Sequence, residues 1–322
     1  MGRKVIQIAD STQLISIPRA WGRKYNIKKG DELEVVEKDN MLEISTKRED
    51  QEMEITLDVS GLDKTCIAYA LRSAYRRGYD VIKVVFNNKT APHYRTGESI
   101  LVTSLLHKEL QRWVGMQIIE QKENYFVYKS ISKASFDDFE LMFRRTFLLL
   151  LDICEDLLKG VKEKDMLHLQ TIEEKYDNIV IFMTYCMRLL NKIGYSQKYK
   201  NSLLHVILFN LYKIADIVKY SARDVMKAKK LHPKTEAILN QIFQTVRMYY
   251  ELFYKYDISK FSKIYEHRDR ILKEIESAKK VVPLEDIMLC VYCRQTLELI
   301  VSNLEATATY YLEEGKPVEK MK

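Results

Sequence analysis

The chain has 322 residues and a formal net charge of +7 at pH 7, with 47% hydrophobic and 30% charged residues. This composition supports packed cores and excludes an intrinsically disordered chain, while 10 Gly and 5 Pro are too few for a sheet-rich fold, which needs frequent turns. No apolar stretch follows a basic region at the start, and the five cysteines lack a disulfide-framework spacing. We therefore expect a cytoplasmic protein of roughly two to three domains that is not an integral membrane protein.

The first segment alternates apolar and polar residues, as strands with one buried face do. Pro18 is well placed to open a short helix, because its ring fixes the backbone angle that a first helical turn needs. The expected elements are strands at Val5–Ala9 and Leu14–Ile17, a helix at Arg19–Tyr25, and strands at Glu32–Glu37 and Met41–Ser45. A unit this small buries too little surface to fold alone, so we predict a homodimer formed through the N-terminal domain.

Two motifs of this segment carry a family resemblance. Ser16-Ile17-Pro18-Arg19-Ala20-Trp21, followed by Ile27 and then by Lys29-Gly30-Asp31-Glu32, resembles the AbrB/SpoVT DNA-binding family over roughly residues 3–46. Members of that family form swapped-hairpin β-barrel dimers. The resemblance implies this fold here, with double-stranded DNA as the partner.

Five basic residues lie in or beside the matched segment, and they are the candidate DNA-binding positions. They are Arg3, Lys4, Arg19, Arg23 and Lys24. Lysine and arginine bind backbone phosphates, and arginine can also bind base edges in bidentate fashion. In isolation the five would be ordinary solvated charges, but with the resemblance we expect at least some of them to contact DNA.

The middle of the chain predicts a compact α+β region after a charged connector at residues 47–55. The expected elements are strand Glu54–Val59, helix Leu62–Gly78, strand Tyr79–Phe86, helix Ser99–Trp113, and strands Met116–Glu120 and Tyr125–Tyr128. His93 and His107 lie apart from any matched carboxylate or nucleophile, so nothing catalytic is expected here. We interpret the region as a connector or dimer-stiffening domain.

From Phe136 onward the pattern is helical, with apolar residues recurring at intervals of three and four as in antiparallel bundles. The predicted helices are residues 136–160, 163–192, 198–229, 233–255, 258–280 and 284–314, with breaks at Gly160, Gly194, Pro233, Asp257 and Pro283. Segment Glu174–Ile179 is similar to Glu266–Ile271, and Leu211–Asp216 lines up with Leu297–Ser302. This order indicates a duplicated three-helix unit.

The duplicated arrangement resembles the PhoU family, regulators linked to phosphate uptake that fold as two three-helix bundles in tandem. Together with the N-terminal motifs and Tyr75-x-x-Gly78-Tyr79-Asp80, it resembles the archaeal phosphate-uptake regulators over nearly the whole chain. The expected fold is multidomain and mainly α. Its domains are an AbrB/SpoVT-like head at 1–47, an α+β connector at 54–131 and a PhoU-like body of tandem three-helix bundles at 135–315.

Some PhoU relatives bind metal clusters through carboxylates four residues apart on facing helices, because hard or transition cations accept oxygen ligands. The corresponding pattern here is incomplete, since Tyr212 and Ser302 stand at two of the carboxylate positions. Ordinary exposed or capping carboxylates are therefore the favoured interpretation. If a divalent or iron-type metal binds, the candidate ligands are Glu174, Asp177, Asp216, Glu266, Asp269 and Glu298.

These patterns favour a regulator without enzymatic activity. The leading hypothesis is a DNA-binding transcriptional regulator of phosphate uptake, with the helical body as sensor or interaction domain. The alternative is an adaptor that does not bind DNA and regulates a phosphate transporter or its sensor kinase through the helical bundles. An enzyme has least support, because the sequence has no glycine-rich phosphate loop, nucleophile elbow or zinc-protease motif.

Overall fold

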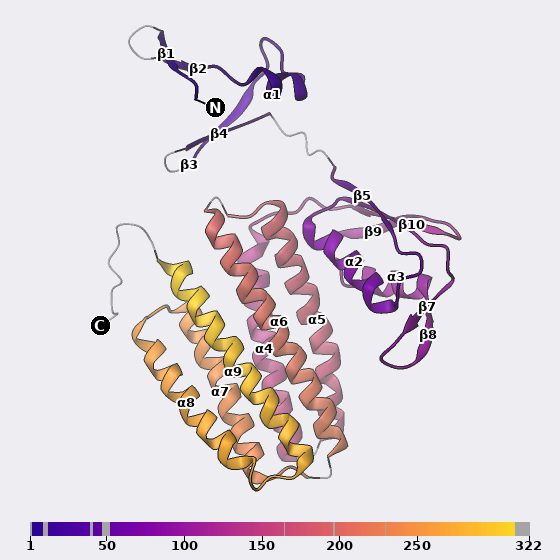
Figure 1. The fold of residues 1–322 in the computed structure, drawn as a ribbon, viewed down its shortest axis with the longest axis vertical. Helices are drawn as coiled ribbons and strands as arrows, with labels where there is room; N and C mark the ends of the chain where they lie inside the picture. The colour runs from indigo at the N-terminus through magenta and orange to yellow at the C-terminus, as the bar shows by residue number, and fades with distance from the viewer. Residues whose placement is uncertain are drawn as a thin grey trace. The chain divides into compact units, whose positions relative to one another are not determined.

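The structure is a computed structural model that describes residues 2–8, 12–38, 41–46, 52–163, 165–195, 197–228 and 230–312. It divides into two compact units, Met1–Glu52 and Met53–Lys322 (Figure 1). Several predicted positions lie outside the described residues: Ala9, residues 47–51 of the connector, residue 229, and the segment beyond Leu312.

The first unit contains two antiparallel hairpins and one short helix. Its elements are β1 (Val5–Ile8), β2 (Thr12–Ile15), α1 (Arg19–Lys24), β3 (Leu33–Lys38) and β4 (Met41–Thr46). Strand β1 pairs with β2, and β3 pairs with β4, as separate two-stranded sheets. The predicted order of strand, strand, helix, strand and strand is confirmed. The turn before β3 is closed by Asp31, whose carboxylate accepts a hydrogen bond from the Lys28 amide at 2.7 Å.

Among its described residues, the first unit has no buried core of its own. Across residues 2–8, 12–37 and 41–46, every side chain is exposed or half-buried. The exposed apolar side chains come from all four strands: Val5, Ile6, Ile8, Leu14, Ile15, Val35, Val36, Met41 and Leu42. Because two-stranded hairpins are marginally stable by themselves, we expect another surface to pack against these apolar faces.

The second unit begins with the α+β region. Its elements are β5 (Glu54–Asp58), α2 (Lys64–Arg77), β6 (Val81–Val85), β7 (Thr90–His93), β8 (Glu98–Leu101), α3 (Val102–Leu110), β9 (Met116–Gln121) and β10 (Tyr125–Ser130). The main sheet has the order β5-β6-β10-β9, with β5 and β6 parallel and the other neighbours antiparallel. Asp63 caps α2 by accepting from the amides of Thr65 and Cys66, and Gly78 ends it with φ 102°. Leu71 and Tyr75 are fully buried against the sheet core.

The helix predicted at Ser99–Trp113 is wrong at its start. Residues Glu98–Leu101 form β8, which pairs with β7, and the helix begins only at Val102. The intervening Gly97 has φ 73°, which a tight turn requires and most residues avoid. The hairpin pairing with the immediately preceding strand therefore overrides the helical periodicity of this short stretch.

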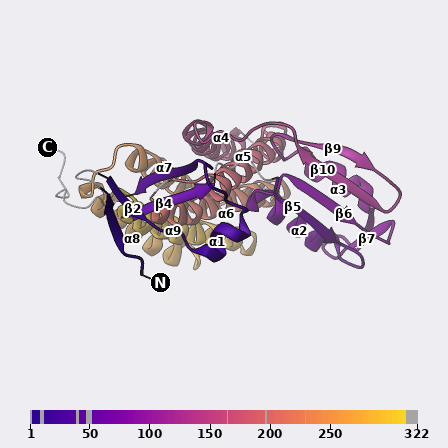
Figure 2. The ribbon, with the colours of Figure 1, turned by 90° about the horizontal axis from the view of Figure 1, so that it is seen from above.

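Six long helices form the rest of the unit. They are α4 (Asp138–Glu163), α5 (Met166–Lys192), α6 (Lys198–Lys227), α7 (Pro233–Tyr254), α8 (Ser259–Ala278) and α9 (Leu284–Tyr311). Two sets of three, α4–α6 and α7–α9, pack side by side, with α6 on α9 and α4 on α7. Viewed from above, the α+β region lies at one end, α4–α6 in the middle and α7–α9 at the other end (Figure 2). The two predicted three-helix sets are thus present, and they share one continuous hydrophobic core.

The predicted break at Gly160 is a second error, because α4 continues to Glu163. This glycine is needed for packing instead. A Cβ at position 160 would lie 2.4 Å from Cδ2 and 2.5 Å from Cγ of Leu169 on α5. Because Gly160 has no side chain, α4 and α5 can approach each other closely at this position.

Two helices, α6 and α9, are long and apolar enough to cross a membrane by length and composition. Core helices of bundles satisfy the same criterion, and α6 and α9 pack against each other inside the body. Within the described residues these two are the only such helices, which is not a many-span membrane topology.

Arg188 of α5 attaches the α+β region to the helical body. Its side chain is 2% exposed, and its guanidinium donates to the carbonyls of Tyr75 and Tyr79 at 2.9 and 2.8 Å and to Asp80 at 3.3 Å. Lys192 forms an ion pair with the same Asp80. The positive charge lies beside the C-terminal end of α2, where free carbonyls and the helix dipole favour a cation. This contact fixes α2 along α5.

Candidate nucleic-acid interface and basic cleft

The predicted DNA-binding residues fall in two groups within the first unit. Arg3 and Lys4 immediately precede β1, and Arg19, Arg23 and Lys24 belong to α1. All five are exposed. Because Val5 pairs with Ile15, the residues before β1 lie at the same end of the hairpin as the segment that leads into α1.

Helix α1 has one half-buried side and one basic side. Trp21 and Gly22 are half-buried, and the Trp21 and Tyr25 rings approach within 5.6 Å. Arg19 and Arg23 are four residues apart, so they share the other face of the helix. Two guanidinium groups on one exposed helical face can contact neighbouring phosphates or base edges.

The predicted metal ligands are not gathered in one place. Among the described residues no group of three or more His, Cys, Asp or Glu side chains could hold a metal ion. Asp177 is paired with Arg112 at 2.5 Å, and Asp216 with Lys219 at 2.8 Å. Arg268 lies 2.9 Å from Asp269 and 3.1 Å from Glu298.

The last two candidate ligands, Glu174 and Glu266, are exposed. The protein's own cations thus neutralise four of the six carboxylates, and this donor set does not fit a multi-carboxylate metal centre. Metal binding at these positions stays a prediction, which metal analysis of protein purified without chelator would test.

A large cleft, which we call the basic cleft, lies within the second unit between the α+β region and the helical body. It has a volume of about 1380 Å³. Helices α2 and α3 and the turn between β7 and β8 supply one side, and α6 and α9 supply the other. Nine lysine and arginine side chains line it, against three carboxylates. Such a surplus of one charge in a concave site concentrates the electrostatic field.

Helix α2 supplies the basic cleft with a regular row of side chains. Lys64, Ala68, Arg72 and Arg76 follow at intervals of four and all line the cleft, as residues on one helical face do. The helix predicted at Leu62–Gly78 contains this row, but the apolar stripe that identifies the helix lies on the neighbouring face, one residue earlier at each turn. Sequence reasoning therefore missed the cleft, although the spacing of the basic residues was a usable signal.

Glu109 is the main counter-charge on this side of the cleft. It is 2% exposed and accepts two hydrogen bonds of 2.6 Å from Arg72, and Arg112 lies 3.5 Å away. Against the effect of burial, the pair with Glu109 raises the pKa of Arg72. One carboxylate thus serves two guanidinium groups, and positive charge remains in excess.

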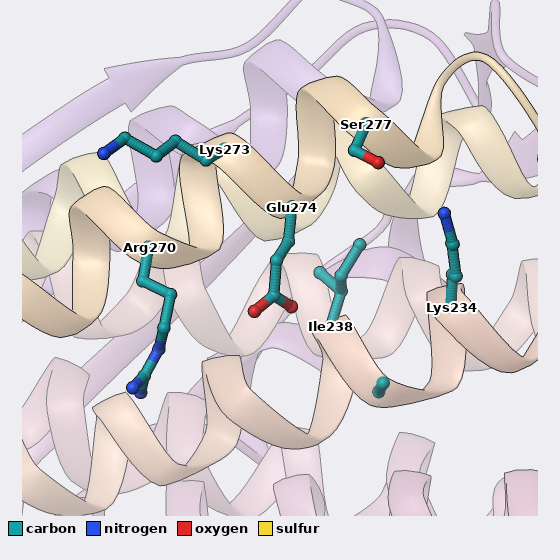
Figure 3. Close-up of a pocket in the computed structure, with 7 residues that line it drawn as sticks. Lys234, Ile238, Arg270, Lys273, Glu274 and Ser277 are labelled. Carbon is teal, nitrogen blue, oxygen red and sulfur yellow. The ribbon is translucent and has the colours of Figure 1, made fainter.

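A smaller hollow of about 400 Å³ lies between α7 and α8. Figure 3 shows Glu274 of α8 directed toward α7. Its carboxylate accepts a hydrogen bond of 2.6 Å from Gln241. Three cations, Lys234, Arg270 and Lys273, line this hollow against the one carboxylate of Glu274, so its surplus of positive charge is smaller than that of the basic cleft.

Comparisons with known proteins give one family match and one similar solved structure. Residues 6–52 match the family described as "Antidote-toxin recognition MazE, bacterial antitoxin". The crystal structure of the phosphate transport system regulatory protein PhoU from Streptococcus pneumoniae is similar at 15% sequence identity and a TM-score of 0.44. The match covers 57% of this chain and 97% of the PhoU chain. No curated protein matches the sequence. Residues 6–52 are thus a MazE/AbrB-type domain, followed in this chain by an α+β region and a helical body of two three-helix sets.

Proposed function

We propose that the chain is a DNA-binding transcriptional regulator, that its N-terminal domain binds double-stranded DNA as a homodimer, and that it controls phosphate uptake. The observation that carries the proposal is the basic face of α1, inside a segment that matches the MazE family. The helical body acts as the sensor or interaction domain. Regulation of phosphate uptake is supported by the PhoU-like sequence pattern and by the two three-helix sets.

Dimerisation is part of this proposal, and the exposed apolar strands support it. Val5, Ile6 and Val35 are between 57% and 61% exposed in the single chain. A second copy would cover such faces, and each fully buried side chain of this size contributes about 1.5–3 kcal/mol. A twofold dimer also presents two α1 helices, which allows two half-sites on a duplex to be bound together.

The test is a titration of a fluorescent DNA duplex with the full chain at several salt concentrations. Each phosphate contact contributes about −0.9 to the slope of log affinity against log salt, so a steep slope is expected. Arg19→Ala/Arg23→Ala should weaken binding and make the slope shallower. Lys159→Ala/Lys162→Ala removes the same charge from exposed positions on α4 and should leave binding unchanged.

Failure to bind DNA at low salt, by a folded dimer, would reject the regulator. It would favour the alternative, an adaptor that regulates a transporter or its sensor kinase through the helical bundles. Equal weakening by the two double variants would mean that overall charge, and not the α1 face, attracts DNA.

A further inference from the structure

The basic cleft holds cations that the protein does not neutralise. Within the described residues, Lys64, Arg76, Arg95 and Lys108 form no ion pair with a carboxylate, and all four line the cleft. Arg95 instead donates to the Tyr220 hydroxyl at 3.3 Å. Cations gathered without counter-charges repel one another, so a folded protein keeps them together at a cost in stability.

Two details show how the excess positive charge affects side chains inside the cleft. Burial, together with repulsion from Lys108 and Arg95, lowers the pKa of the Lys64 ammonium. Arg76 packs over the rings of Phe209 and Tyr212 at 5.7 and 5.9 Å, and its buried Nε has no hydrogen-bond partner. A buried donor without a partner is uncommon in folded proteins, so the Arg76 guanidinium beside the cleft is incompletely satisfied by the protein itself.

The size and lining of the cleft narrow the class of anion. Its volume of about 1380 Å³ far exceeds what one inorganic phosphate needs, since sites for drug-sized molecules span about 300–1,000 Å³. Aromatic rings lie among the cations: Tyr69 is 62% exposed and Phe209 is 46% exposed. Exposed rings provide stacking surfaces for a flat heterocycle, and several cations together suit a chain of phosphates.

We propose that the basic cleft binds a polyphosphate group carried on a nucleoside. The phosphates would lie among Lys64, Lys108 and Arg95, and the base would stack on the aromatic side chains of the same cleft. This site stands independently of DNA binding by the N-terminal domain. It lies between two regions whose contact is fixed by Arg188, so a bound ligand would touch both.

The experiment is isothermal titration calorimetry of the full-length protein with ATP, tripolyphosphate and inorganic phosphate, in a buffer that contains a metal chelator. ATP should bind with one site per chain, tripolyphosphate more weakly, and inorganic phosphate weakest. Lys64→Ala/Lys108→Ala should raise the Kd for ATP by at least about tenfold, because removing a single hydrogen bond to a charged group weakens binding by roughly this factor. Lys159→Ala/Lys162→Ala, which removes the same charge outside the cleft, should leave the Kd within about twofold of the wild-type value.

Arg95→Ala, in the turn between β7 and β8, is the second variant and should also weaken ATP binding. No saturable binding of ATP would overturn the proposal, as would equal weakening in the cleft and control variants. Tripolyphosphate binding as tightly as ATP would overturn the nucleoside part. A single-stranded oligonucleotide that binds more tightly than ATP, and binds more weakly to Lys64→Ala/Lys108→Ala, would assign the cleft to a nucleic-acid strand instead.

Discussion

Arg188 offers the sharpest test of how the second unit is held together. In Arg188→Met the carbonyls of Tyr75 and Tyr79 lose their charged donor, and Asp80 keeps Lys192 as its charged partner and the Met53 amide as a neutral donor. Breaking a buried ion pair by removing one partner costs about 3–5 kcal/mol. For a chain of this size that corresponds to a fall of about 6 °C or more in Tm.

The assay is thermal and urea unfolding followed by circular dichroism, with Arg223→Met as the matched control. Arg223 pairs with Glu173 at 2.5 Å, but both side chains are 42% exposed, and exposed pairs contribute about 0–1 kcal/mol. A destabilisation in Arg188→Met no larger than that in Arg223→Met would refute Arg188 as the anchor. A double-mutant cycle that combines Arg188→Met with Asp80→Asn would separate the contribution of the Arg188–Asp80 ion pair from that of the packing of Arg188 over the Tyr75 ring.

Three other predictions concern packing, pH and assembly. Gly160→Ala should lower the free energy of unfolding by about 1–3 kcal/mol, despite the better helix propensity of alanine, because its Cβ meets Leu169; unchanged urea unfolding would contradict this. Burial, and to a smaller extent repulsion from the Arg270 charge, lowers the pKa of His267 below the usual 6.5. The unfolded chain therefore takes up the proton first, so stability should fall as the pH drops from 6.5 through the folded pKa; an equally steep fall in His267→Gln would exclude this residue as the cause. Val35→Lys should convert a dimer to the 38.1 kDa monomer in light scattering, while Val281→Lys, at a similarly exposed position on the helical body, should not; a wild-type monomer would count against dimerisation.

The error at Ser99–Trp113 shows where local sequence stops being informative. Residues Glu98–Leu101 have apolar spacing that suits a helix, yet they pair with Thr90–His93. Strand pairing depends on the partner strand, which here lies just before the predicted helix and outside the stretch whose periodicity suggested it. At Gly160 the error has the opposite form, because a residue that usually ends helices is required inside one by the close approach of α5.

The candidate sites divide in the same way. The basic face of α1 could be found from sequence, because Arg19 and Arg23 lie in one short helix whose spacing is local. For the basic cleft only the row on α2 has a local signal, since Arg95 and Lys108 meet Lys64 only when the turn, α3 and α2 are folded together. The predicted metal ligands show the converse, because their sequence repeat did not reveal that Arg112, Lys219 and Arg268 would pair with them.

The sequence by itself determined the order of the elements in the N-terminal unit, its basic residues and the six long helices. These follow from period, turn residues and caps, which act over a few residues. Tertiary structure alone decided which cations of the cleft have a carboxylate partner, and how α2 is anchored by Arg188. Those properties depend on distances between residues far apart in the chain, and electrostatic interactions change steeply with distance and burial.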